Sequence, residues 1–178
     1  MKLKTISKDG IAEAIAKAEH YRHLHEPEES ESICHDILAV DPENQTALRI
    51  LGLSITDEFT GEVSDRYSEA ESTFQRLTDP YERQYYIGLL CERQAKKQMR
   101  AGRPPHAVMA LFQEAMRYFE AAENIRPPKN DDAVLRWNRC ARLLEKLPKV
   151  ELPGPQEGFE SHDTAPVGAS PWSAKSSK

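Results

Sequence analysis

The sequence has few cysteines, no Cys-x-x-Cys pair and no long apolar run. Its three cysteines, Cys34, Cys91 and Cys140, are odd in number and far apart, which argues against a disulfide framework and favours a reducing compartment. No segment has the roughly 20 apolar residues that a membrane-spanning helix needs, and the basic start of the chain is not followed by an apolar signal core. We therefore expect a cytoplasmic protein that does not insert into a membrane.

Positive charge is also scarce. The 178 residues include 24 lysines and arginines against 29 aspartates and glutamates, which gives a net charge of -5. A phosphate backbone would be repelled on average, and no basic stripe with interleaved aromatic residues offsets this repulsion. With 39% hydrophobic and 30% charged residues, the composition is that of a globular chain with a well-solvated surface. We expect no nucleic-acid partner.

The motifs of common catalytic sites are missing as well. The sequence has neither a glycine-rich phosphate loop nor a G-x-S-x-G nucleophile motif. The cysteines fall on the apolar faces of expected helices, where packing accounts for them, and none of them can be assigned a partner base. We predict that the protein is not an enzyme, and we assign it no catalytic residue and no cofactor.

The sequence does contain a series of helical segments, and its fold class is predicted to be all-α. Apolar residues recur at helical spacing, while the alternation typical of β-strands is absent. Asp79 is expected to cap a helix that has Pro80 in its first turn. Seven helices are expected, ending near these prolines and glycines: Pro27, Pro42, Gly61, Pro80, Gly102, Pro127 and Pro148.

Two short patterns recur in these helices. The third helix contains Leu48-x-x-Leu51-Gly52-x-x-Ile55, and the fourth contains Ala70-x-x-x-Phe74, which returns in the sixth as Ala115-x-x-x-Phe119. These patterns resemble the tetratricopeptide repeat, with leucine and isoleucine in place of the usual tryptophan and tyrosine. A small residue lets two helices approach closely, the aromatic residue fills the space between hairpins, and the glycine removes a side chain where the helices cross.

The resemblance covers residues 11–146 and implies a fold. We expect an α-hairpin solenoid of three tetratricopeptide-like hairpins plus a C-terminal capping helix, together forming a repeat domain over residues 1–147. Residues 148–178 are rich in proline, serine and glycine and are expected to form a disordered tail.

The chain also departs from the family pattern. Ser30 and Cys34 replace the usual alanine and aromatic residue of the first hairpin, and the second hairpin carries extra residues after its first helix. Both helices of the third hairpin are longer than usual. For that reason we do not assign Gly88 the packing role of Gly52.

The resemblance further implies a function, because the first helices of successive hairpins line a concave groove in this family. We expect a non-enzymatic adaptor or assembly scaffold that binds a protein or peptide there. Tyrosine and arginine are common anchors of interfaces, and of the adjacent Tyr85 and Tyr86 one should pack and the other be exposed, since they point about 100° apart. The lysine and asparagine set of members that clamp a C-terminal carboxylate is absent, so we do not expect that partner class. The expected groove residues are Arg22, Arg49, Leu53, Tyr85, Arg93 and Arg139.

Two other functions stay open at this point. His20, His23 and His25 could share a metal ion, although their spacing matches no complete metal motif and we assign no metal site. The uncovered end of the stack could instead self-associate, which makes a homo-oligomer possible. In the tail, Trp172 could belong to a short docking motif or to an inert segment.

Overall fold

The computed structural model describes residues 2–62 and 65–147, and within these ranges it contains helices and no β-strand. The all-α prediction is thus confirmed, while the predicted tail with Trp172 lies outside the described residues. A 3₁₀ turn at Lys8–Gly10 precedes seven helices: α1 (Ile11–His23), α2 (Pro27–Val40), α3 (Gln45–Asp57), α4 (Tyr67–Gln75), α5 (Pro80–Arg100), α6 (Pro105–Asn124) and α7 (Asp132–Leu144).

The helix starts follow from local chemistry. Pro27, Pro80 and Pro105 each lie in the first turn of a helix. A backbone N–H group at that position has no hydrogen-bond partner within the helix, so its absence in proline costs no hydrogen bond. As predicted, the Asp79 carboxylate caps α5 by accepting hydrogen bonds from the backbone N–H groups of the first turn. Asn44 caps α3 in the same way. These side chains satisfy amides that would otherwise lack a partner at the helix start.

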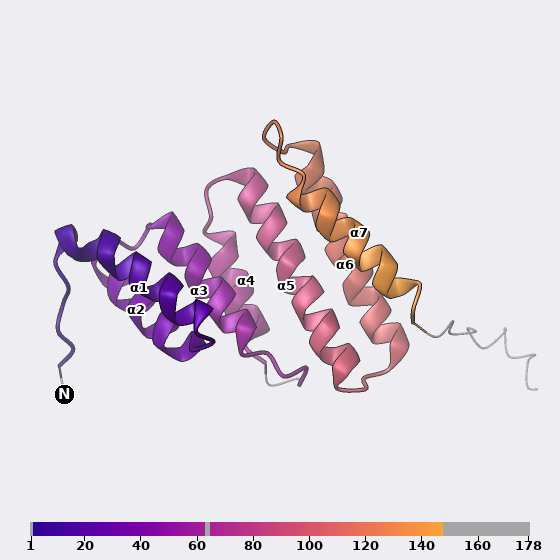
Figure 1. The fold of residues 1–178 in the computed structure, drawn as a ribbon, viewed down its shortest axis with the longest axis horizontal. Helices are drawn as coiled ribbons and strands as arrows, with labels where there is room; N and C mark the ends of the chain where they lie inside the picture. Colours follow the sequence, from indigo (N-terminus) through magenta and orange to yellow (C-terminus); the bar gives the residue numbers. More distant parts are fainter. Residues whose placement is uncertain (1, 63–64, 148–178) are drawn as a thin grey trace, which may run out of the picture.

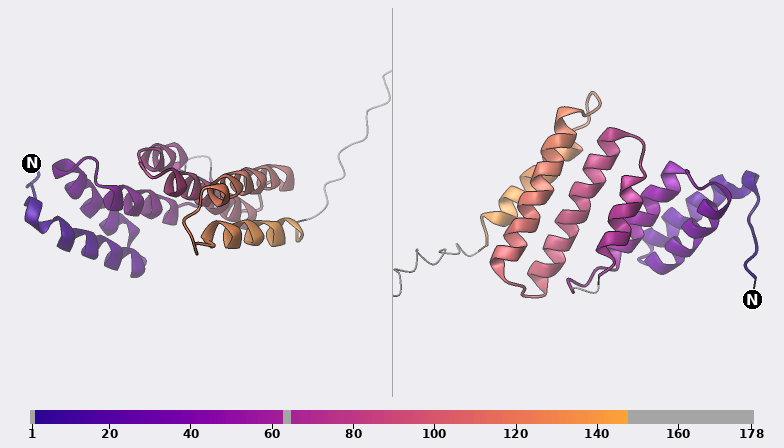
Figure 2. Two further views of the ribbon diagram at one scale, coloured as in Figure 1. Left: turned by 90° about the horizontal axis from the view of Figure 1, so that it is seen from above. Right: turned by 180° about the vertical axis from the view of Figure 1, so that it is seen from behind.

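The helices are arranged in chain order along the long axis of the molecule (Figure 1), so that α1 and α7 lie at opposite ends. Figure 2 shows the same order from above and from behind. Each helix packs against the next one in the chain, and each odd-numbered helix also contacts the next odd-numbered helix. The helices α1, α3, α5 and α7 therefore share one side of the molecule, which we call the odd-helix face.

The hydrophobic core continues along the whole row of helices. One group of buried side chains, including Leu48, Phe74 and Leu90, joins α1 to α5. A second group, including Phe112 and Cys140, joins α5 to α7. Half-buried residues such as Leu53 and Tyr86 pack against both groups. Each helix buries its apolar face only by packing against other helices, so the stability of each helix depends on its neighbours.

Two glycines allow close crossings between paired helices. A Cβ atom on Gly52 of α3 would lie 2.4 Å from Cε1 of Phe74 on α4, and one on Gly88 of α5 would lie 2.9 Å from Cε1 of Phe119 on α6. The predicted role of Gly52 is confirmed. The expectation for Gly88 was wrong, because it meets an aromatic ring in the same manner despite the longer helices.

The unusual residues of the first hairpin are part of the packing. Ser30 and Cys34 on α2 are fully buried, and the Ser54 hydroxyl on α3 donates a hydrogen bond to the Ser30 hydroxyl at 2.9 Å. All three cysteines are free and buried, as their positions on apolar faces predicted. Burial raises the pKa of the Cys34 thiol to about 12, so this group stays protonated and unreactive at neutral pH.

Candidate binding surface

The six residues predicted to line a groove all lie on odd-numbered helices. Arg22 is on α1, Arg49 and Leu53 are on α3, and Tyr85 and Arg93 are on α5, all five half-buried, while Arg139 is exposed on α7. Hydrogen bonds from Arg22, Arg49 and Arg93 each reach another odd-numbered helix.

Asp57, at the C-terminal end of α3, connects three of these helices. Arg22 Nε on α1 donates to Asp57 Oδ2 at 2.7 Å. From α5, Arg93 donates to the other Asp57 oxygen, to Thr56 Oγ1 at 2.6 Å and to the Leu53 carbonyl oxygen at 3.2 Å. One carboxylate thus holds two arginines from separate helices. Asp57 could not be identified from the sequence, because its partners lie more than thirty residues away in both directions.

Arg93 is the more deeply placed of these two arginines. Burial lowers the pKa of its guanidinium, and the Asp57 carboxylate acts in the opposite direction. An arginine keeps its proton even so, and Arg93 is therefore a permanent positive charge fixed between α3 and α5.

A second ion pair lies on the same face. Arg49 Nη1 on α3 donates to Glu82 Oε1 on α5 at 3.0 Å, with both side chains about 30% exposed. This pair again joins two odd-numbered helices, so Arg49 contributes to the packing of the face as well as to its surface charge.

The tyrosine pair differs from our expectation, because both rings are packed and half-buried. Tyr86 stacks on Phe74 at a centroid distance of 5.4 Å, while Tyr85 stacks on Tyr81 and lies 5.9 Å from Phe119. The two rings diverge as helix geometry requires, but each meets an aromatic residue of an adjacent helix, Tyr86 meeting Phe74 on α4 and Tyr85 meeting Phe119 on α6. Neither tyrosine is an exposed anchor.

A buried carboxylate attaches α7 to α5. The Glu92 side chain is fully buried, receives a hydrogen bond from Lys96 Nζ at 2.9 Å and lies 3.4 Å from Arg136 Nη1 on α7. The predicted α7 residue, Arg139, is one turn beyond Arg136 and is exposed. Sequence reasoning missed Glu92. The only local signal was the i,i+4 spacing of Glu92 and Lys96.

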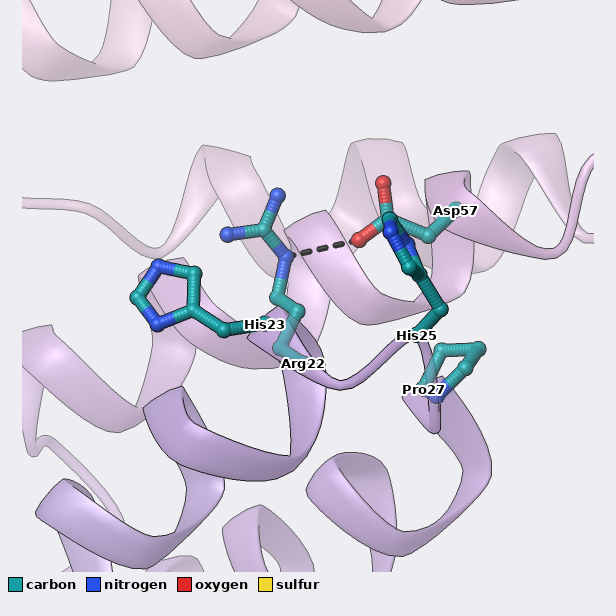
Figure 3. A pocket seen from close by; sticks show the side chains of 5 residues that line it. All are labelled: Arg22, His23, His25, Pro27 and Asp57. Carbon is teal, nitrogen blue, oxygen red and sulfur yellow. Dashed lines mark hydrogen bonds and ion pairs between the residues drawn. The ribbon is translucent and has the colours of Figure 1, made fainter.

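Two cavities meet at Asp57. The first, of about 360 Å³, is lined by Arg22, His23, His25, Pro27 and Asp57, and Figure 3 shows Arg22 reaching from α1 to the Asp57 carboxylate there. The second, of about 270 Å³, is lined by Thr56, Asp57, Arg93, Lys96, Lys97 and Arg100. The second cavity has four cationic side chains and one carboxylate in its lining and is positively charged, whereas in the first cavity Arg22 is paired with Asp57.

The histidines considered as metal ligands are arranged differently. Over residues 2–62 and 65–147 no group of three or more histidine, cysteine, aspartate or glutamate side chains is placed to hold a metal ion. His23 and His25 line the first cavity beside the ion pair of Arg22 and Asp57.

A separate charged cluster lies where α2 meets the start of α4. The Arg66 guanidinium donates to both oxygens of Glu31, at 2.8 and 2.7 Å, and to Glu69. These hydrogen bonds hold the pKa of Glu31 below its usual value, whereas burial raises the pKa of the nearby Glu58. Arg66 faces three carboxylates in this cluster, those of Glu31, Glu58 and Glu69. Its two hydrogen bonds to Glu31 fix the start of α4 against α2.

No helix of the described residues is both long and apolar enough to cross a membrane. Comparison of the chain with protein-family models, with curated proteins and with solved structures gave no match. The interpretation of the odd-helix face therefore depends on its own geometry and charge.

Proposed function

We propose that this protein is a non-enzymatic interaction module, an adaptor or assembly scaffold, and that it binds a protein or peptide on the odd-helix face. In this proposal the helix pairs form three tetratricopeptide-like hairpins capped by α7, and the odd-helix face is the concave groove of the solenoid. The two equivalent crossings, Gly52 with Phe74 and Gly88 with Phe119, support a repeated hairpin.

The observation that carries the functional proposal is the pair of cavities meeting at Asp57. They are hollows on the one side of the molecule to which α1, α3 and α5 all contribute side chains. A face built from several rigid helices presents its side chains in fixed positions, and preorganisation of this kind reduces the entropic cost of binding.

The test is affinity capture of the tagged full chain from its native cells, with bound proteins identified by mass spectrometry. The informative variant exchanges the partners of one ion pair, Arg49→Glu/Glu82→Arg, which keeps the pair but reverses the charge pattern. A partner of the odd-helix face should be lost from this variant and retained by Arg117→Glu, an exposed site on α6. If no captured protein distinguishes the two variants, the proposed function is wrong.

A further inference from the structure

The largest difference in length between the third hairpin and the second lies at one end of the hairpin. Gly88 lies twelve residues before the end of α5, whereas Gly52 lies five before the end of α3. Phe119 lies fourteen residues after the first residue of α6, whereas Phe74 lies seven after that of α4. Both helices are thus extended by the same seven residues on the same side of the crossing, about two turns or 10 Å.

This extension carries a row of basic residues. Beyond Arg93, which lies beside the end of α3, helix α5 continues with Lys96, Lys97 and Arg100. All four line the second cavity, at the i, i+3, i+4 and i+7 positions that share one helix face. The extra turns of α5 therefore form one wall of a hollow whose opposite wall is the C-terminal end of α3.

The charges around this hollow are strongly unequal. Six cations, which we call the basic strip, follow one another across the odd-helix face, and only two carboxylates, Asp57 and Glu92, pair with them. In the described part of the chain no ion pair is made by Lys97 or Arg100. The basic strip consists of Arg22, Arg93, Lys96, Lys97, Arg100 and Arg136.

Helix electrostatics alone does not account for this arrangement. Basic residues are favoured in the last turn of a helix by its dipole, which explains Lys97 and Arg100. It also accounts for Arg22, in the last turn of α1. It does not explain Arg136, which lies near the start of α7, and it does not predict a hollow. In a chain with a net charge of -5, a concentration of positive charge in a concave site indicates a negatively charged ligand.

We propose that the basic strip binds an acidic segment of the partner protein, in extended conformation and with two carboxylates separated by one residue. In an extended chain such residues point to the same side about 6.6 Å apart. Cations on successive turns of α5 are about 5.4 Å apart along the helix axis, so neighbouring carboxylates can each reach one of them. This inference rests on the proposed function and narrows it to one chemical class of partner.

The experiment measures binding of the full chain to a labelled synthetic peptide in which glutamate and serine alternate, by fluorescence anisotropy. The test variant is Lys97→Glu/Arg100→Glu. The control is Lys17→Glu/Arg117→Glu, which changes the net charge equally at two exposed sites, on α1 and α6. Circular dichroism checks that both remain folded, and Lys97→Gln/Arg100→Gln repeats the test without introducing negative charge.

Affinity should fall about tenfold or more in the test variant, which corresponds to about 1.4 kcal/mol, and should change less than about twofold in the control. The glutamine variant should show an intermediate loss. A peptide with lysine in place of glutamate should not bind. The inference is overturned if both charge-reversed variants lose affinity equally, if the lysine peptide binds as well, or if a single-stranded oligonucleotide binds more tightly than the acidic peptide.

The same variants separate this inference from the proposed function. A partner that is captured by the full chain, lost with Arg49→Glu/Glu82→Arg and retained with Lys97→Glu/Arg100→Glu would leave the interaction module standing and refute the acidic segment. Loss of the partner with both variants, together with binding of the acidic peptide, supports the inference.

Discussion

Replacing Gly52 with alanine tests the packing of the hairpins most directly. In an unhindered helix this substitution stabilises a protein by up to about 1 kcal/mol, because alanine is the better helix former. Here the new Cβ atom would lie 2.4, 2.6 and 2.8 Å from three ring carbons of Phe74. That ring is fully buried and stacks on Tyr86, so packed neighbours oppose its movement.

The magnitude follows from these opposing effects. Inserting a methyl group into a well-packed core costs about 1–3 kcal/mol, and contacts this short with a confined ring indicate the upper part of that range. After subtracting the gain in helix propensity, we expect a net loss of about 2 kcal/mol in the free energy of unfolding. With a urea m-value of about 2 kcal/mol/M, the unfolding midpoint should fall by about 1 M.

The assay is urea unfolding followed by circular dichroism, applied to Gly52→Ala, Phe74→Leu and the double variant. Phe74→Leu removes the ring atoms that the new methyl group would meet, so in that background Gly52→Ala should cost much less, and the cycle should give a coupling of about 1–2 kcal/mol. Gly88→Ala should cost less than Gly52→Ala, since its shortest contact is 2.9 Å. A Gly52→Ala protein more stable than the wild type would refute the close crossing.

Three further predictions concern the charges and thiols. Glu92→Ala should lower the free energy of unfolding by about 2 kcal/mol, because it removes a fully buried side chain and its charged hydrogen bonds to Lys96 and Arg136. Glu114→Ala, on the exposed side of α6, should change it little. Equal effects of the two substitutions in urea unfolding would contradict this. Burial raises the pKa of Cys91 to about 11 and that of Cys140 to about 12. None of the three cysteines should therefore react with iodoacetamide in the native protein at neutral pH, whereas all three should react in urea. A cysteine that mass spectrometry shows to react rapidly in the native protein would contradict the buried positions. Arg66 lowers the pKa of Glu31 from its usual 4.5, so the pair stabilises the fold above that pH, and this contribution is lost as the pH falls through the lowered pKa. Glu31→Gln should therefore lower the free energy of unfolding by about 1 kcal/mol at neutral pH and by less in acid. An effect of Glu31→Gln that grows in acid would contradict this reasoning.

Helix number and helix ends could be predicted from the sequence because their causes are local. Proline in a first turn, a capping carboxylate such as Asp79 and the spacing of apolar residues all act within a few residues. The helices that these signals define agree with the structure to within a few residues. The close crossing at Gly52 was expected from the same kind of short pattern, whereas its contact with the Phe74 ring was not.

The features that could not be predicted depend on pairs distant in the chain. Asp57 binds Arg22 and Arg93, and Glu92 binds Arg136, yet nothing local distinguishes these carboxylates from solvated ones. Gly88 was misjudged for a different reason. Longer helices suggested a shifted crossing, whereas the helices are lengthened on either side of the crossing and the contact of the glycine with the aromatic ring is kept.

Three of the arginines expected to contact a partner also join neighbouring helices of the protein itself. Arg22, Arg49 and Arg93 are each bonded to a carboxylate of a neighbouring helix, and a ligand that displaced such a bond would leave that carboxylate without its partner, at a cost that offsets much of the gain. An acidic ligand therefore gains most from the cations that have no such bond, on the extended end of α5. The paired arginines still contribute, because their positive charge is fixed in position and needs no rearrangement on binding. On this reasoning Lys97 and Arg100 determine how tightly the ligand is held, while Arg22 and Arg93 keep the face positively charged and hold α1, α3 and α5 together.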